Sequence, residues 1–129
     1  MDNRKLRKIR AETPAPSVDA QIAAEAGTAL TGVEGPAARD LPRSIFRAYD
    51  IRGVVDKTLD SGIARSVGQA IGSLALEQDA GPVVVARDGR LSGPYLMEGM
   101  IEGITAAGCD VLDIGAVPTG VLYYAAHEF

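Results

Sequence analysis

The sequence contains one cysteine and one histidine, and each scarcity removes a class of function. Cys109 alone cannot build a disulfide framework or a cysteine-based metal cluster within the chain. His127 is the single histidine, so neither a histidine-based metal site nor a Ser-His-Asp triad has its parts. The apolar runs are far shorter than the roughly 20 residues that a membrane helix needs. A basic start without a following apolar core is not a secretory signal either, and we expect a cytoplasmic protein.

Positive charge is scarce outside the first ten residues. Those ten contain five Lys and Arg against Asp2 alone, whereas residues 41–129 contain seven against eleven Asp and Glu. Affinity for a polyphosphate backbone comes mostly from Lys and Arg that neutralise phosphates. We therefore expect no nucleic-acid partner.

Residues 1–42 differ in composition from the rest of the chain. After the basic start, Pro and Gly interrupt a weak Ala-rich helical pattern over residues 18–30. Little apolar surface is available to offset the ordering entropy, so we expect a disordered or weakly helical extension or linker. The alternatives are a seam to an upstream domain or a basic patch on an anionic bilayer, where each cation is worth roughly 1 kcal/mol. Without a second anchor, we expect no membrane contact by residues 1–10.

From residue 43 onward the pattern predicts an α/β domain, residues 43–129. Strands are predicted at 45–49, 83–86 and 111–115, and helices over about 59–74 and 94–107 and from about 121. This alternation favours a three-layer fold, with residues 83–86 as a central strand covered on both faces. Three aromatic residues near the end have no strand after them (Tyr123, Tyr124 and Phe129), so we expect a domain that is incomplete at its C-terminus.

The first predicted helix carries two further local signals. Thr58, Asp60 and Ser61 are each suited to its N-cap. Gly68 and Gly72 lie beside the apolar stripe, where they would let another backbone approach closely. They are not a dinucleotide-binding fingerprint, because no strand directly precedes them and the glycine spacing is wrong.

The segment from Arg47 to Gly53 places polar residues between apolar flanks. In a regular strand Tyr49 and Arg52 would point to opposite faces. If the chain turns at Asp50 and Ile51, their Cα atoms lie less than about 7 Å apart. We expect a strand that breaks into a polar loop, with Tyr49 and Arg52 facing one pocket. The alternative is a packed phenol and a capping arginine.

Three loops are predicted to follow strands, and ligands of open parallel sheets bind beyond the carboxyl ends of strands. Arg52, Arg87 and Arg90 in these loops offer guanidinium groups suited to phosphate. The pattern predicts an anionic, phosphorylated small molecule. For Arg87 and Arg90 the alternative is local bracing by ion pairs with Asp88.

Three other residues that could carry chemistry have simpler interpretations. Cys109 begins a predicted strand and is expected to be a small buried hydrophobe, because no partner base accompanies it. Asp110 and Asp113 flank the same strand and are expected to be solvated or turn-forming, not metal ligands.

Residues 41–55, with the sequence LPRSIFRAYDIRGVV, resemble the start of bacterial phosphomannomutase/phosphoglucomutase, of the α-D-phosphohexomutase family. The resemblance continues through residues 87–94 and 117–126 and covers about residues 41–129. It implies a mixed, mainly parallel sheet in an α/β/α sandwich, the first of four domains. The remaining domains of the same enzyme would then be partners of this chain.

Members of this family interconvert hexose 1-phosphates and 6-phosphates of mannose or glucose. The resemblance implies an active-site phosphoserine, a bisphosphorylated sugar intermediate, and Mg²⁺ held by the second domain. By position, Tyr49 matches a tyrosine that lines the sugar site. Arg52 matches an arginine beside the phosphoserine, where a fixed cation would stabilise the transferring group.

The sequence departs from the family pattern in two places. It contains no Ser-His-Asn-Pro segment, which carries the family's catalytic serine, and Thr119-Gly120 stands where relatives usually have Thr-Pro. The resemblance therefore implies that this chain alone is inactive. The alternative function is a non-catalytic α/β module that binds a phosphosugar or a protein partner.

Overall fold

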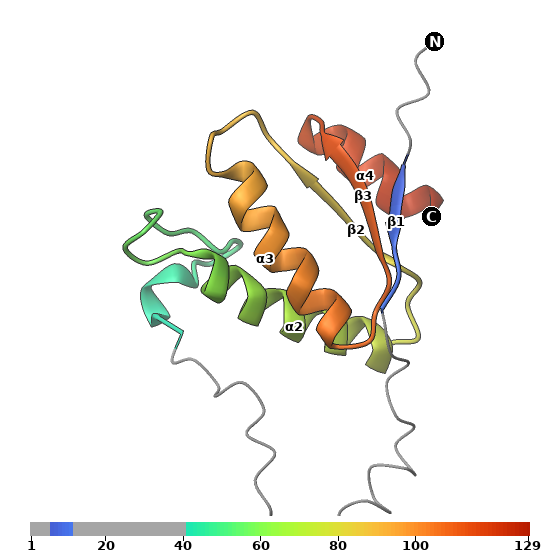
Figure 1. Ribbon diagram of the computed structural model, residues 1–129, viewed down its shortest axis with the longest axis horizontal. Coiled ribbons are helices and arrows are strands. Elements are labelled where there is room, and N and C mark those ends of the chain that lie inside the picture. The colour runs from blue at the N-terminus through green and yellow to red at the C-terminus, as the bar shows by residue number, and fades with distance from the viewer. Residues whose placement is uncertain (1–5, 12–40) are drawn as a thin grey trace, which may run out of the picture.

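The computed structural model describes residues 6–11 and 41–129, which form an α/β fold around a mixed three-stranded sheet (Figure 1). The strand order is β1-β3-β2. β2 (Val83–Arg87) and β3 (Val111–Ala116) are parallel and are joined through helix α3 (Gly93–Ala106). β1 (Arg7–Ile9) pairs with β3 in the antiparallel direction. The predicted α/β class and the β-α-β unit are confirmed.

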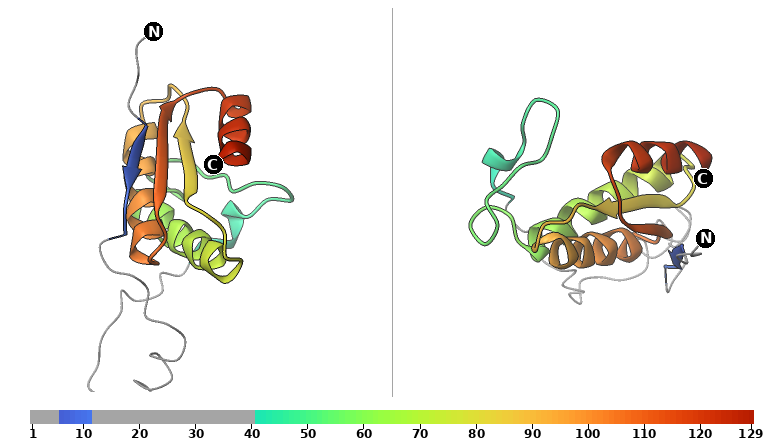
Figure 2. Two further views of the ribbon diagram at one scale, coloured as in Figure 1. Left: turned by 90° about the vertical axis from the view of Figure 1, so that its right-hand side faces the viewer. Right: turned by 90° about the horizontal axis from the view of Figure 1, so that it is seen from above.

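Helices cover both faces of the sheet. Figure 2 shows α3 on one face and α4 (Thr119–Glu128) on the other, which gives the three predicted layers. Helix α2 (Ser61–Glu77) makes its main packing contact with α3. In the described part of the chain, no helix is long and apolar enough to cross a bilayer.

Helix α2 begins at the predicted capping residue. The Asp60 side chain accepts a hydrogen bond from the Ile63 backbone N–H at 2.8 Å. This bond satisfies one of the backbone donors that a helix start leaves without an intrahelical partner. Of the apolar stripe that predicted the helix, Ile63 and Val67 are buried, whereas Ile71 and Leu74 remain exposed.

Glycines form the contact between α2 and α3, two from each helix (Gly68, Gly72, Gly99 and Gly103). A Cβ atom added at Gly103 would overlap the backbone carbonyl oxygen of Arg65. A Cβ atom at Gly72 would lie 2.9 Å from the backbone oxygen of Ile104. The predicted close approach of another backbone to Gly68 and Gly72 is thus confirmed, and α3 supplies that backbone.

The core lies between α3 and the sheet. Its buried cluster consists of Val85, Ile104, Cys109 and Val111, against which the half-buried Ile9 packs. The Cys109 side chain is a buried free thiol, as expected from its place at a strand start. Burial of these aliphatic side chains supplies the main driving force for joining the helix to the sheet.

The strand predicted at residues 45–49 is wrong. Residues Arg43–Ile45 form a short 3₁₀ helix, η1, and then a single antiparallel bridge joins Phe46 to Ile51. The Arg52 N–H donates to the Ile45 carbonyl at 2.8 Å and closes this loop. Ile45 is fully buried, so the apolar pattern predicted the anchor correctly. No described strand lies beside Phe46 to continue a ladder, and therefore no sheet strand forms there.

Two further expectations differ from the structure. Within the predicted extension, residues 7–9 form strand β1 instead of a disordered or helical segment. The helical pattern over residues 18–30 lies outside the described residues. Among the described strands β3 is central, whereas β2, expected to be central, lies at an edge.

Candidate functional site

Residues 47–52 form the exposed turn that carries both predicted site residues. The Arg47 N–H donates to the Asp50 carbonyl at 2.8 Å, inside the bridge between Phe46 and Ile51. The chain therefore reverses at Ala48 and Tyr49, not at Asp50 and Ile51 as expected. This places Tyr49 at the tip of the turn, where its side chain is fully exposed.

An ion pair holds the guanidinium group of Arg52. Its Nε–H donates to Asp50 Oδ2 at 2.8 Å, and the other carboxylate oxygen, Oδ1, accepts from the Ile51 N–H at 2.9 Å. Within the described residues no hydrogen bond or ion pair engages the two Nη groups of Arg52. The geometry thus fixes one side of the guanidinium fork and leaves the other side for a further acceptor, the arrangement that suits bidentate binding of phosphate.

This pair leads to a prediction about pH. The hydrogen bond from Arg52 holds the pKa of Asp50 below its ordinary value, aided by the Ile51 N–H and opposed by partial desolvation. The stabilisation is therefore fully present above the unfolded pKa of about 3.9 and is lost as pH falls through the lower folded pKa. We expect the NMR signal of Arg52 Nε–H to stay constant from pH 7 to about pH 4 and to shift in more acidic solution.

The matched control is the Asp88-Gly89-Arg90 sequence, which has the same spacing. The Arg90 Nε lies 3.0 Å from Asp88 Oδ2, and the Arg90 N–H donates to Asp88 Oδ1. Asp50→Asn should shift the Arg52 signal at pH 7 and leave the Arg90 signal in place, whereas Asp88→Asn should do the reverse. A wild-type Arg52 signal that already matches the Asp50→Asn variant at pH 7 would contradict the ion pair.

Tyr49 and Arg52 border one shallow depression. Its volume is about 440 Å³, and residues of the turn alone line it (Arg47, Ala48, Tyr49, Asp50 and Arg52). Tyr49 and Arg52 thus border the same space, as expected. That this space binds a phosphorylated ligand stays a prediction. Sequence reasoning missed the contributions of Arg47 and Asp50, although the Asp-x-Arg spacing was the available signal.

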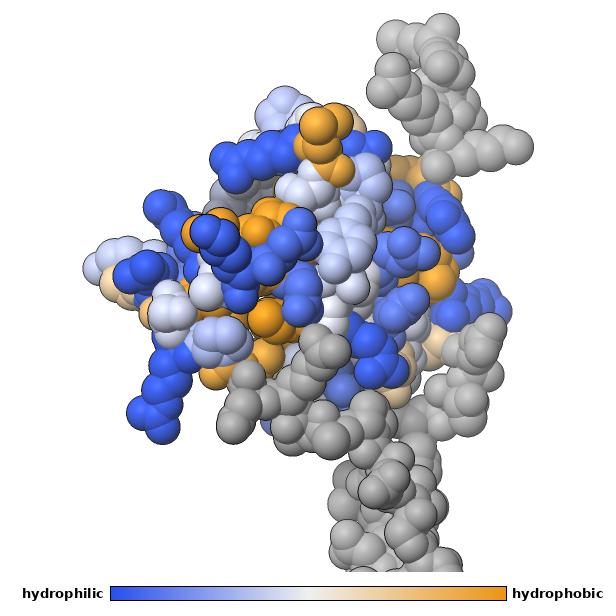
Figure 3. Space-filling model, turned by 60° about the vertical axis from the view of Figure 1, so that its left-hand side comes forward, coloured by the Kyte–Doolittle hydropathy of each residue, from blue (hydrophilic) through white to orange (hydrophobic). Residues whose placement is uncertain are grey.

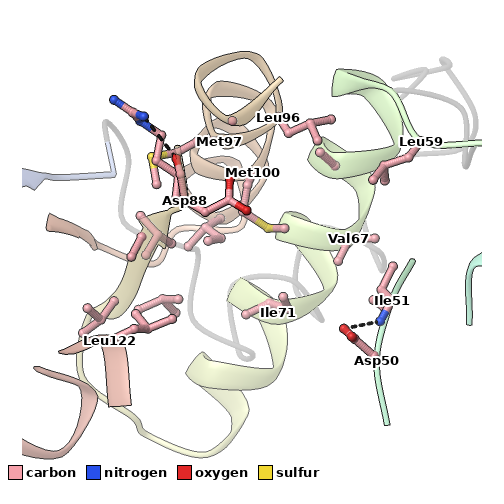
Figure 4. Close-up of a pocket in the computed structure, with 18 of the residues that line it drawn as sticks. Asp50, Ile51, Leu59, Val67, Ile71, Asp88, Leu96, Met97, Met100 and Leu122 are labelled. Atoms are coloured by element: carbon pink, nitrogen blue, oxygen red, sulfur yellow. Dashed lines mark hydrogen bonds between the residues drawn. The ribbon is translucent and has the colours of Figure 1, made fainter. Parts of the chain in front are cut away.

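A larger cavity of about 720 Å³ opens next to the turn. Figure 4 shows apolar side chains from α2, α3 and α4 around it, among them Val67, Met100 and Leu122. Tyr49 and Asp50 also line this cavity, and Arg52 does not. Such a lining suits apolar side chains and not a phosphate group, since unpaired charge in apolar surroundings is costly. Figure 3 shows patches of apolar surface, in orange, among hydrophilic residues on the face that it draws.

The loop after β2 is braced by its own residues. Besides the Asp88–Arg90 pair, the Arg87 Nη1 group lies 3.4 Å from the Asp88 carbonyl oxygen. Arg87 lines the larger cavity but not the depression beside Arg52, and Arg90 lines neither. The structure thus favours local bracing for these two arginines over a shared phosphate site.

The carboxylates of Asp110 and Asp113, next to and within β3, accept hydrogen bonds from backbone N–H groups. Asp113 Oδ1 accepts from the Gly115 N–H at 2.8 Å, within β3 where its register with β2 shifts and Gly115 has a φ of 77°. Asp110 Oδ1 accepts from the Ala11 N–H at 3.1 Å. Across the described residues no group of three or more His, Cys, Asp or Glu side chains is placed to hold a metal ion.

Comparison with known proteins assigns the domain to a family. Residues 43–129 match the family described as phosphoglucomutase/phosphomannomutase, alpha/beta/alpha domain I. The chain belongs to this family. The matched residues include the turn with Tyr49 and Arg52, helices α2, α3 and α4, and strands β2 and β3, whereas β1 precedes them.

Relatives within the family are similar over the same region. A protein of Pseudomonas putida named phosphomannomutase/phosphoglucomutase is 60% identical over 87 residues, which are 67% of this chain and 19% of the relative. A phosphoglucomutase of Neisseria gonorrhoeae is 49% identical over 86 residues, again 67% and 19%. A solved family member from Burkholderia thailandensis is 58% identical with a TM-score of 0.65, over 66% of this chain and 19% of that one. The chain thus spans about one fifth of the length of these relatives.

Proposed function

We propose that residues 43–129 act as the first domain of a cytoplasmic phosphohexomutase. The proposed reaction interconverts hexose 1-phosphate and hexose 6-phosphate, of mannose, glucose or both. A phosphoserine donates its phosphoryl group and a bisphosphorylated sugar then returns the other phosphate to the serine. The observation that carries this proposal is the 60% identity, over 87 residues, to a protein named phosphomannomutase/phosphoglucomutase.

The turn supports the roles proposed for its two residues. Arg52 is held at Nε by Asp50, and its Nη groups remain for a phosphoryl oxygen. We propose that this guanidinium stabilises the group in transfer, since a fixed cation acts without reorganising during the reaction. Tyr49 is exposed beside it, and its ring is proposed to contact the sugar.

Two components of the proposed reaction do not come from this sequence. The 129 residues contain no Ser-His-Asn-Pro segment, so the proposed phosphoserine belongs to a further segment. The described residues do not provide the carboxylate cluster that Mg²⁺ prefers, and the proposed metal ligands belong to a second domain.

A domain replacement tests the proposal. The matched 87 residues of the P. putida relative are replaced by residues 43–129, and mutase activity is measured with mannose 1-phosphate and glucose 1-phosphate in the presence of Mg²⁺. We expect turnover within about tenfold of the parent, because the replaced segment is 60% identical. The 129-residue chain alone should show no turnover with either substrate.

Two outcomes would contradict the proposal. A folded chimera without activity would mean that residues 43–129 do not serve as this domain. Turnover by the 129-residue chain would mean that its own residues complete the site. Binding of glucose 1-phosphate to the chain alone, together with an inactive chimera, would support the non-catalytic binding module instead.

A further inference from the structure

Strand β1 lies outside the family-matched region, yet it closes one edge of the sheet. The match begins at residue 43, whereas β1 comprises Arg7–Ile9. Its register pairs Arg7 with Asp113 and Ile9 with Val111, about 100 residues further along the chain. A free strand edge is a template for pairing with other chains, and proteins cover such edges with short or charged strands.

The backbone of β3 pairs with β2 along one edge and with β1 along the other. Val83 N–H donates to the Asp110 carbonyl, so the polar backbone groups of Asp110 face β2. Because successive residues of a strand direct these groups to opposite edges, those of Leu112 also face β2, and those of Val111 and Asp113 face β1. Without β1, the Val111 and Asp113 groups would lie on an open edge.

Side chains of residues 6–11 and of the β3 region also stabilise the pairing of β1 with β3. Ile9 packs on the core cluster that contains Val111. Asp110 accepts the Ala11 N–H at 3.1 Å, and its other carboxylate oxygen lies 3.4 Å from Lys8 Nζ. The backbone N–H of Ala11 is the largest influence that lowers the pKa of Asp110, followed on the same side by Lys8. The carboxylate is therefore ionised at neutral pH and attracts the basic segment.

We propose that the outer edge of β3 is a strand-docking surface whose ligand is this chain's own basic segment, residues 6–11. The segment acts as an intramolecular clip that closes the sheet edge against pairing with other chains. The basic side chains of this segment are attracted to Asp110 and not to an anionic membrane surface. This inference is independent of the proposed mutase function, because it uses only residues of the 129-residue chain.

Amide hydrogen exchange of the whole chain, followed by NMR, tests the clip. The Val111 and Asp113 amides should be protected in the wild type. Ile9→Asp should accelerate their exchange at least about tenfold, because it removes a half-buried aliphatic contact. Lys8→Glu should accelerate it by about two- to fivefold, as its ion pair is half exposed. The Leu112 amide, which faces β2, should keep its protection in both variants.

The control variant is Lys57→Glu, which makes the same charge change at an exposed residue outside the clip. It should leave the exchange of Val111 and Asp113 unchanged. Equal rates for these amides in the wild type and in Ile9→Asp would overturn the clip. Protection that disappears on dilution would show that a second copy supplies the strand and would overturn the intramolecular assignment.

Vesicles that contain phosphatidylserine separate the clip from membrane binding. The wild-type chain should not sediment with them, and its Val111 and Asp113 amides should remain protected in their presence. Co-sedimentation with loss of this protection would show that the anionic surface is the preferred partner of residues 6–11 and would overturn the proposal.

Discussion

Replacing Gly103 by alanine should destabilise the domain by at least about 3 kcal/mol, near the upper end of the usual cost of overpacking. The new Cβ atom would overlap the backbone oxygen of Arg65, and a backbone cannot move aside as a flexible side chain can. Helices α2 and α3 would have to separate. Urea unfolding followed by circular dichroism measures the change.

Gly120→Ala is the matched control for this substitution. Gly120 is also a helical glycine, in α4, but a Cβ atom there would meet nothing within 4 Å. Alanine in a helix is favoured over glycine by up to about 1 kcal/mol, so this variant should be equally stable or more stable. A loss below about 1 kcal/mol for Gly103→Ala would show that the two helices can shift apart at little cost.

Arg52→Ala in the chimera should lower kcat by about 10²- to 10³-fold, the usual cost of removing a fixed donor to a developing charge. The argument rests on the 2.8 Å contact that holds Nε to Asp50 and leaves the Nη groups for phosphate. Tyr49→Ala should mainly raise KM, because its exposed ring is proposed to contact the sugar and not the transferring group. Steady-state kinetics separates the two effects.

Asp50→Asn and Asp88→Asn complete this experiment. The first should lower kcat less than Arg52→Ala does, since the guanidinium remains but its orientation is no longer fixed. The second removes the equivalent carboxylate from the Arg90 pair and should leave kcat unchanged. If Arg52→Ala and Tyr49→Ala both retain the kinetics of the unmodified chimera, these residues do not belong to the site.

The elements predicted correctly from the sequence are those whose signal is local and repeated. In α2 the spacing of Ile63 and Val67 recurs with the helical period, and Asp60 caps the first turn. In β2 a run of valines predicts a strand, but its place in the sheet depends on which segments pair with it. The sequence of β2 alone therefore does not determine whether this strand lies at an edge or in the centre of the sheet.

The missed features depend on distant partners or on one or two contacts. β1 is a three-residue strand, too short for an alternating pattern, and its partner β3 lies about 100 residues away. In the turn, the apolar pair Ile45 and Phe46 suggested a strand, yet only Ile45 is buried. The reversal at Ala48 and Tyr49 follows from the Phe46–Ile51 bridge, which sequence spacing alone does not specify.

The glycine contact between α2 and α3 has a mechanical consequence for the turn. Gly53 leaves no room for a Cβ atom beside Leu59, and the Val54 N–H donates to Thr58 Oγ1 at 2.9 Å, so the turn is attached to the start of α2. Since backbone meets backbone at Gly103, α2 cannot slide along α3 without a clash. The turn that carries Tyr49 and Arg52 should therefore move together with α2 and α3 as one rigid unit. A displacement of Arg52 relative to α2 and α3 then requires bending within residues 46–52.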